Sequence, residues 1–256
     1  MLHGLKVAKA ENESQITSGD RFKLVNLGDV SAKDDVQLEA DSIDKGVTQF
    51  RRPEDGAWDP SHPNIYYFVT TDIFNGDTRL WKLTFDDISD PASGGKIEIA
   101  VDSPSGNPAE MFDNIAIDKN SNIVMLEDVG NNPYLGKVWE RSAGGTMTQV
   151  AVHNPDLFDP NLLGPGVKGP NFLTQDEESS GVIDMASILG PGWFMLDVQA
   201  HFTNKDPELV EGGQLLLMHI NGTGGTTTQP TSSASSIGPA AKLQRDSLFS
   251  DQSILG

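Results

Sequence analysis

The stretch Asn64-Ile-Tyr-Tyr-Phe-Val-Thr-Thr71, with Arg79-Leu-Trp-Lys-Leu-Thr-Phe85 after it, decides the fold of this chain. The first segment is rich in aromatic and β-branched residues, and the second alternates apolar with polar side chains. Each segment therefore predicts a β-strand. Asn75-Gly76-Asp77 lies between them and is typical of a turn. A second turn at Gly94-Gly95 leads into Lys96-Ile-Glu-Ile-Ala-Val101, which predicts a third strand.

The same pattern returns twice further along the chain. Short strands with turns every 8–12 residues, in groups that recur at roughly 45–60 residues, are typical of β-propeller blades. We therefore predict an all-β chain that forms about three to four blades of a β-propeller, with a β-sandwich as the rival architecture. The recurring strands are expected at residues 113–118, 123–127, 136–141, 146–152, 181–184, 192–198 and 213–220.

The two ends of the chain differ from this repeating part. Residues 4–9 and 21–27 alternate as half-buried strands do, and residues 36–44 predict a short helix. From Asn221 onward Gly, Thr, Ser, Gln and Pro dominate, and such a composition cannot bury enough apolar surface to order itself. We therefore predict a propeller domain over residues 1–220 and a flexible tail over 221–256, with a brief helix at 243–251.

The composition excludes several classes of function. The net charge of −19, from 37 acidic and 18 basic residues, argues against nucleic acid or an anionic membrane surface as a partner. The chain has no cysteine, so it offers neither disulfides nor thiolate metal ligands. No apolar run is long enough to predict a membrane span. The first ten residues also lack the features of a signal peptide, so any export signal is expected outside this chain.

The densest group of charged residues is Gln49-Phe-Arg-Arg-Pro-Glu-Asp-Gly-Ala-Trp-Asp59. Pro53 and Gly56 predict a tight loop that holds Arg52 beside Glu54 and Asp55. A guanidinium next to carboxylates suits a site that handles a phosphate-like anion together with a metal ion. The alternative is a surface loop whose arginine and glutamate form a solvated salt bridge.

Further acidic clusters lie where strands are expected to meet loops. In a propeller the starts of the innermost strands converge on the central channel, so dispersed clusters can form one cation site. Oxygen atoms of Asp, Glu and Asn are the ligands that Ca²⁺ prefers. Each cluster alone is also compatible with an ordinary turn, and a lone histidine is more often structural than a ligand. The candidate metal ligands are Glu54, Asp55, Asp113, Glu127, Asp128, Asp176, Glu177, Glu178, Asp197 and His201.

Motifs for other reactions are missing from the sequence. There is no Gly-x-Ser-x-Gly elbow, no Walker loop and no His-Glu-x-x-His. Ser179-Ser180 has no histidine that the sequence can pair with it, so we predict that these two serines belong to a turn. His153 and His219 have no charged cluster around them in the sequence.

Several motifs in fixed order resemble the PhoX-type alkaline phosphatase family, over roughly residues 46–220. They are Arg52-Pro-Glu-Asp-Gly-Ala-Trp-Asp-Pro60, Phe68-Val-Thr-Thr-Asp72, Arg79-Leu-Trp-Lys-Leu-Thr-Phe-Asp86, Met111-Phe-Asp-Asn114, Glu127-Asp128 with Gly130-Asn-Asn132, Asp176-Glu-Glu-Ser-Ser-Gly-Val-Ile-Asp184, Gly190-Pro-Gly-Trp-Phe194, Asp197-Val-Gln-Ala-His201 and Glu208-Leu-Val-Glu-Gly-Gly-Gln214.

This resemblance implies a periplasmic or extracellular six-bladed propeller that hydrolyses small phosphate monoesters. The family's channel holds calcium and a pair of irons. By analogy Arg52 would hold phosphate and take part in catalysis with Glu54, which would also be a metal ligand, and an acidic residue of the 176–178 run would ligate metal as well.

Two departures from the family pattern shape these expectations. The chain begins where the family's sequences are about half done, and the family's iron-bridging cysteine belongs to the missing part. We therefore expect Ca²⁺ rather than Fe³⁺, and a second chain that completes the propeller or a fragment that is inactive alone. The hypotheses are a calcium-dependent phosphatase, a non-catalytic calcium-binding propeller fragment, and a lactonase- or esterase-like propeller.

Overall fold

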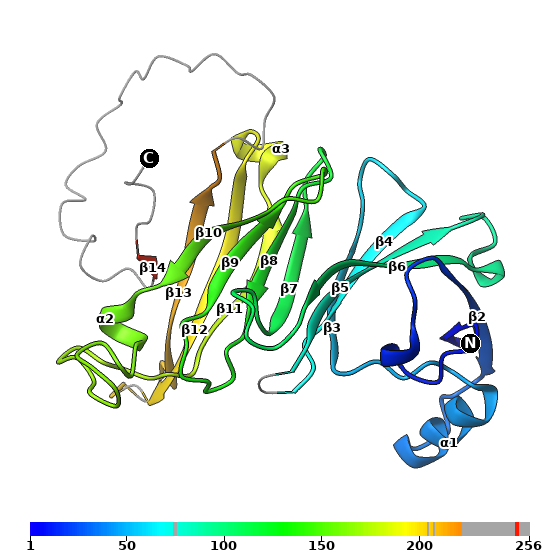
Figure 1. Cartoon of the computed structure of the whole chain (residues 1–256), viewed down its shortest axis with the longest axis horizontal. Helices are drawn as coiled ribbons and strands as arrows, with labels where there is room; N and C mark the ends of the chain where they lie inside the picture. The colour runs from blue at the N-terminus through cyan, green and yellow to red at the C-terminus, as the bar shows by residue number, and fades with distance from the viewer. Residues whose placement is uncertain (74–75, 204, 207, 222–248, 251–256) are drawn as a thin grey trace. The chain divides into compact units, whose positions relative to one another are not determined.

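The computed structural model describes residues 1–73, 76–203, 205–206, 208–221 and 249–250. These residues form mostly antiparallel β-sheet (Figure 1), which confirms the all-β prediction. The chain divides into two compact units, Met1–Asp113 and Asn114–Gly256, and each is described by itself below.

The first unit holds a six-stranded antiparallel sheet that curls into a half-barrel (Figure 1). Its strand order is β1-β2-β6-β5-β4-β3, so that β3 to β6 run as a four-stranded meander. The strands are β1 (Leu2–Val7), β2 (Asp20–Gly28), β3 (Pro53–Trp58), β4 (Ile65–Thr70), β5 (Thr78–Phe85) and β6 (Gly95–Ser103). Two short 3-10 turns, η1 (Glu13–Gln15) and η2 (Pro91–Ser93), and the helix α1 (Asp35–Lys45) complete the unit.

Alternation along β5 builds the core of this unit. Trp81, Leu83 and Phe85 point to the same side of the strand and are buried together with Phe22 and Ile97. The predicted helix is confirmed as α1. Asp34 accepts a hydrogen bond from the N–H of Gln37 at its start, and Gly46 ends the helix in a left-handed conformation.

The predicted turn at Gly94-Gly95 is a point of close backbone approach. Gly94 has φ +89°, and a Cβ added there would lie 1.9 Å from the carbonyl oxygen of Phe22. No larger residue fits this position without moving β2 away from the turn.

The second unit consists of two antiparallel sheets. One has the order β14-β10-β9-β8-β7 and the other the order β11-β12-β13. Buried residues of both sheets, among them Val124, Leu126, Phe194 and Leu196, share one core cluster, so the sheets pack against each other. The elements are β7 (Phe112–Ile117), β8 (Ile123–Glu127), β9 (Lys137–Arg141), β10 (Met147–His153), α2 (Pro155–Phe158), β11 (Glu177–Asp184), α3 (Ala186–Leu189), β12 (Trp193–Thr203), β13 (Glu211–His219) and β14 (Phe249–Ser250).

Three local predictions were wrong. The Arg52–Gly56 segment is not a loop, because Pro53–Trp58 forms strand β3 and pairs with β4, with Gly56 opposite Phe68. Ser179-Ser180 is not a turn, because both serines lie in β11 opposite Val198 and Asp197 of β12. Glu177 and Glu178 therefore lie in a strand rather than before one, and Asp197 lies in the middle of β12 rather than at its end.

The predicted tail over 221–256 lies outside the described residues except for Asn221 and Phe249–Ser250. The latter pair forms β14, which pairs with Val152 and His153 of β10. This pairing replaces the expected helix at those two positions, and the rest of the helix expected at 243–251 lies outside the described residues.

Candidate functional site

Two neighbouring arginines converge on one aspartate at the start of β3. Nη1 of Arg51 lies 2.9 Å from Oδ2 of Asp72, and Nη1 of Arg52 donates to the backbone oxygen of Asp72 over 3.3 Å. Nη2 of Arg52 lies 3.4 Å from Oε1 of Glu54. We call Arg51, Arg52, Glu54 and Asp72 the arginine site.

The backbone of the arginine site is held in an uncommon conformation. Arg52 and Asp72 have φ angles of +51° and +63°, a region that residues other than glycine rarely adopt. Two backbone hydrogen bonds hold this geometry, from the N–H of Thr71 to the oxygen of Arg52 and from the N–H of Asp72 to the oxygen of Arg51. The structure therefore fixes the direction in which the two arginine side chains leave the sheet.

A buried carboxylate supports the site from behind. The side chain of Glu13, in η1, is fully buried. Its Oε2 accepts a hydrogen bond from the backbone N–H of Arg51 over 2.8 Å, and its Oε1 lies 2.8 Å from Nη1 of Arg79. The Arg79 guanidinium also contacts Asp102 at 2.9 Å and Asp77 at 3.3 Å. The guanidinium of Arg79 is thus surrounded by three carboxylates and only 13% of its side chain is exposed, whereas the side chains of Arg51 and Arg52 are about half exposed.

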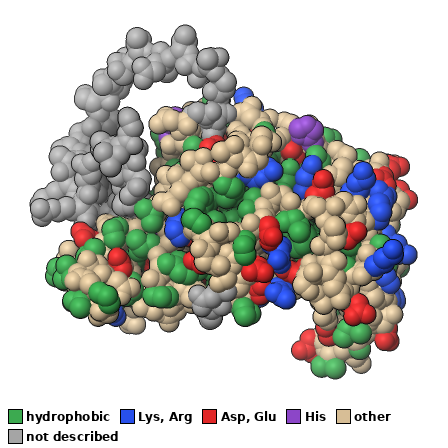
Figure 2. Space-filling model, in the orientation of Figure 1, with side chains coloured by type: hydrophobic (Ala, Val, Ile, Leu, Met, Phe, Trp, Pro, Cys, Tyr) green, Lys and Arg blue, Asp and Glu red, His purple; other side chains and the backbone are tan. Residues whose placement is uncertain are grey.

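The pKa shifts at the arginine site favour the charged forms of Arg51 and Asp72. Burial pushes the pKa of Asp72 upward, but Arg51 and the backbone N–H groups of Ile73 and Asp77 outweigh it, so the pKa lies below its ordinary value. The hydrogen bond from Arg51 to Asp72 raises the pKa of Arg51. The side chains of Arg51 and Arg52 remain 47% and 45% exposed. Figure 2 shows basic and acidic side chains interspersed over the face of this unit that is in view.

The predicted metal ligands near the arginine site are spread out. Glu54 is exposed on β3, and Oδ1 of Asp55 accepts a hydrogen bond from the N–H of Gly56. Asp113 is half-buried in β7. Across the part of the chain that the structure describes, no three His, Asp or Glu side chains are grouped so that they could hold a metal ion. The calcium site therefore stays a prediction.

The carboxylates of Glu127 and Asp128 in the second unit accept hydrogen bonds from N–H groups of the protein. The fully buried Glu127 accepts hydrogen bonds from Nε1 of Trp139 at 2.6 Å and from the backbone N–H of Lys137 at 3.0 Å. Asp128 accepts from the N–H of Gly130 and forms an isolated β-bridge with Glu178.

His201 joins the three strands of the β11-β12-β13 sheet at one end. Its Nδ1 lies 3.0 Å from Oε2 of Glu211, and its Nε2 lies 3.4 Å from Oε2 of Glu178. Burial lowers the pKa of His201, but Glu211, Glu178 and the charge of Asp176 outweigh it, so the pKa lies above its ordinary value. Burial and the charge of Asp128 raise the pKa of Glu178. His201 therefore acts as a cross-link between carboxylates on neighbouring strands.

A serine, a histidine and a glutamate that are far apart in the sequence meet inside the second unit. Nε2 of His153 lies 2.6 Å from Oγ of Ser179, and Nδ1 of His153 lies 3.4 Å from Oε1 of Glu177. Oε2 of Glu177 is buried without a hydrogen-bond partner among the described residues. The groups follow the order of a hydrolase triad, but the 3.4 Å between Nδ1 of His153 and Glu177 is not a hydrogen bond. All three residues are fully buried, so no substrate reaches the Ser179 hydroxyl, and the group is structural in this conformation.

Sequence reasoning missed part of each cluster. The sequence could have indicated Arg51, because it adjoins Arg52. The contacts of both arginines with Asp72 could not be predicted, because they depend on the pairing of β3 with β4. Glu13 and Glu211 were not among the candidate site residues, because their partners Arg79 and His201 come from other elements.

None of the described helices has the length and apolar character needed to cross a membrane. Comparisons with protein-family models, with curated proteins and with solved structures found no match for this chain.

Proposed function

We propose that the arginine site binds the phosphoryl group of a small phosphate monoester, as the phosphate-binding part of a PhoX-like phosphatase. The observation that carries the proposal is the convergence of Arg51 and Arg52 on Asp72 with both guanidinium groups about half exposed. A guanidinium presents a planar fork of donors that matches two oxygens of a phosphate. Two such groups in one site would offer N–H donors to more oxygens of a phosphate than one arginine can.

The surrounding carboxylates orient the arginines rather than bind the anion. Asp72 holds Arg51, and Glu54 limits the movement of Arg52. During hydrolysis the two guanidinium groups would stabilise negative charge on the phosphoryl oxygens, which is the usual electrostatic contribution of arginine to this reaction. Calcium would supply a Lewis acid when bound, but the described carboxylates are not grouped around one point, so we derive no step through it.

The wider setting of the proposal comes from the same resemblance. We propose that the meanders β3–β6 and β7–β10 are blades of a propeller, which matches the four antiparallel strands of a blade. The chain would then act outside the cytoplasm, in the periplasm or the extracellular space, on small phosphorylated molecules.

The test is a calorimetric titration of the full chain with inorganic phosphate and with p-nitrophenyl phosphate, in the presence of Ca²⁺ or of a chelator. We expect Arg52→Asn to weaken binding about tenfold, or ~1.4 kcal/mol, and asparagine is chosen because it tolerates a positive φ. Arg21→Ala is the matched control, because Arg21 is 50% exposed and pairs with a single carboxylate, Asp86.

Release of p-nitrophenol in the same samples separates binding from hydrolysis. Turnover that needs Ca²⁺ and disappears in Arg52→Asn supports the whole proposal, and binding without turnover under any metal condition restricts it to a phosphate-binding role. The proposal fails if neither phosphate nor the ester binds, or if Arg21→Ala loses as much affinity as Arg52→Asn.

A further inference from the structure

Strand β13 has one edge that pairs with β12 and a second edge, called the open edge below, with which none of the described strands pairs. Its residues pair with β12 from His219 opposite Trp193 to Gly212 opposite Ala200, and no described strand pairs with its other edge. The N–H of Ile220 donates to the oxygen of Gly192, one step beyond this ladder. Because hydrogen-bonded pairs alternate in an antiparallel ladder, even-numbered residues bond to β12. The backbone groups of the odd-numbered residues 213, 215, 217 and 219 therefore point to the open edge.

The open edge also carries apolar side chains on both faces. Leu216 and Met218 pack on the core between the two sheets, whereas Leu215 and Leu217 point the other way and are 71% and 48% exposed. Edge strands are usually protected from pairing by lysine, proline, a bulge or a covering element. Residues 211–219 contain no lysine and no proline, and their ladder with β12 is regular from Gly212 to His219. This edge is built like a strand that accepts a neighbour.

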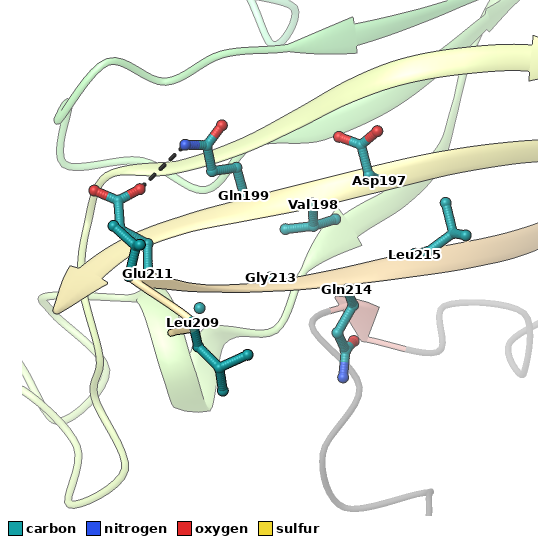
Figure 3. Close-up of a pocket in the computed structure, with 10 residues that line it drawn as sticks. Asp197, Val198, Gln199, Leu209, Glu211, Gly213, Gln214 and Leu215 are labelled. Carbon is teal, nitrogen blue, oxygen red and sulfur yellow. Dashed lines mark hydrogen bonds between the residues drawn. The ribbon is translucent and has the colours of Figure 1, made fainter. Parts of the chain in front are cut away.

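A shallow groove of about 480 Å³ lies along the same strand (Figure 3). In Figure 3 the hydrogen bond from Gln199 to Glu211 lies at one end of the groove. Leu215 lies at the other end. Gly213 lies between Glu211 and Leu215 and contributes no side chain to the groove, whereas the side chains of Leu215 and Leu217 are exposed on the same face. The strand therefore offers a hollow and a projection on one face.

We propose that β13 pairs antiparallel with β13 of a second copy of this chain, about a two-fold axis at Leu215. In this register Leu215 lies opposite the partner's Leu215, and Gly213 lies opposite the partner's Leu217. Each Leu217 then fills the hollow beside the other copy's Gly213. Glu211 lies opposite the partner's His219, so the one acidic and the one imidazole side chain of the strand face each other.

Three observations favour a copy of the chain over another partner. The register joins the odd-numbered residues of both strands, which are the ones whose backbone groups point outward. It overlaps all nine residues of β13, and it is self-complementary in shape and in charge, as a two-fold interface must be. Two chains of net charge −19 repel each other, so the dimer is expected to strengthen as added salt screens that repulsion.

The test is sedimentation-velocity analysis of the full chain over a range of protein and salt concentrations. We expect a species of twice 27.6 kDa whose fraction rises with salt. Leu215→Lys would place two ammonium groups opposite each other and raise the dissociation constant at least about tenfold. Ile183→Lys is the matched control, because Ile183 is 52% exposed and lies in the row Ile183–Met195–Leu217 on the far strand β11.

A cysteine variant gives an independent readout if Leu215→Lys does not fold. The chain has no cysteine, so Leu215→Cys should form a disulfide-linked dimer under mild oxidation, since paired residues of this kind lie ~5.5 Å apart. Ile183→Cys should stay monomeric on a non-reducing gel. A monomer at every concentration and salt overturns the proposal, and so does a dimer on which the substitutions at 183 and 215 act equally.

Discussion

Replacing Glu13 with glutamine tests the network that supports the arginine site. The Glu13 carboxylate is fully buried and accepts a hydrogen bond on each oxygen, from Arg79 and from the backbone N–H of Arg51. Glutamine keeps the shape of the side chain but removes its charge. One of its two polar atoms is an N–H donor, which would face a donor of Arg51 or Arg79. The substitution thus removes an ion pair and a hydrogen bond together.

The expected loss in the free energy of unfolding depends on the ion-pair partners that Arg79 retains. Removing one partner of a buried ion pair costs ~3–5 kcal/mol when the other charge is left alone. Arg79 retains Asp102 at 2.9 Å and Asp77 at 3.3 Å, and its side chain is 13% exposed. We therefore expect a loss near the lower limit, about 3 kcal/mol of the free energy of unfolding. At roughly 4 °C per kcal/mol, Tm should fall by about 12 °C.

Urea unfolding followed by tryptophan fluorescence measures this loss. Trp81 lies in the core of the same unit and 6.0 Å from the guanidinium carbon of Arg79, so its emission reports on the affected region. Glu98→Gln is the control, because it removes a partly exposed partner of Lys82 and should cost less than about 1 kcal/mol. If Glu13→Gln costs no more than Glu98→Gln, the buried network does not stabilise this unit.

Two further predictions concern protonation and close packing. The folded-state pKa of His201 lies above its ordinary value of 6.5, so the stability that protonated His201 contributes is fully present below pH 6.5 and is lost as pH rises through the raised pKa. Melting curves between pH 5 and 9 should show this loss, and His201→Gln should remove that part of the pH dependence. Gly94→Ala should cost more than about 3 kcal/mol, because its Cβ would meet the oxygen of Phe22 at 1.9 Å. Gly19→Ala, where φ is +97° but no atom lies within 4 Å of the new Cβ, should cost only about 1 kcal/mol in the same urea titration, and equal losses would contradict this packing argument.

The sequence predicted the strands well wherever burial follows a simple pattern. Ile123–Glu127 is buried at every position, and the expected strand has the same bounds as β8. From Trp81 to Phe85 in β5 the alternation of apolar and polar residues matches the alternation of buried and half-buried side chains. In both cases the local pattern and the tertiary environment agree, so the sequence alone is sufficient.

Prediction failed where tertiary pairing overrides local preference. Pro53 and Gly56 favour a turn, but β3 gains a hydrogen-bonded partner in β4, and the left-handed conformation moves to Arg52. Glu177 and Ser179 look like surface residues in the sequence, yet both are buried, where the N–H of Gly136 and the ring of His153 hydrogen-bond to them from other parts of the chain. Such partners are far apart in the sequence, so no spacing rule could have found them.

The pairing of β14 with β10 has a consequence for how the second unit folds. Val152 pairs with Ser250, which is 98 residues later in the chain (250 − 152). Closing a loop of that length costs roughly 4 kcal/mol of chain entropy, and a ladder of two residue pairs offsets little of it. During synthesis this edge of β10 therefore cannot pair with β14 until about a hundred more residues have left the ribosome. We therefore expect the sheet to acquire its last strand late in folding, after the four-stranded meander has formed.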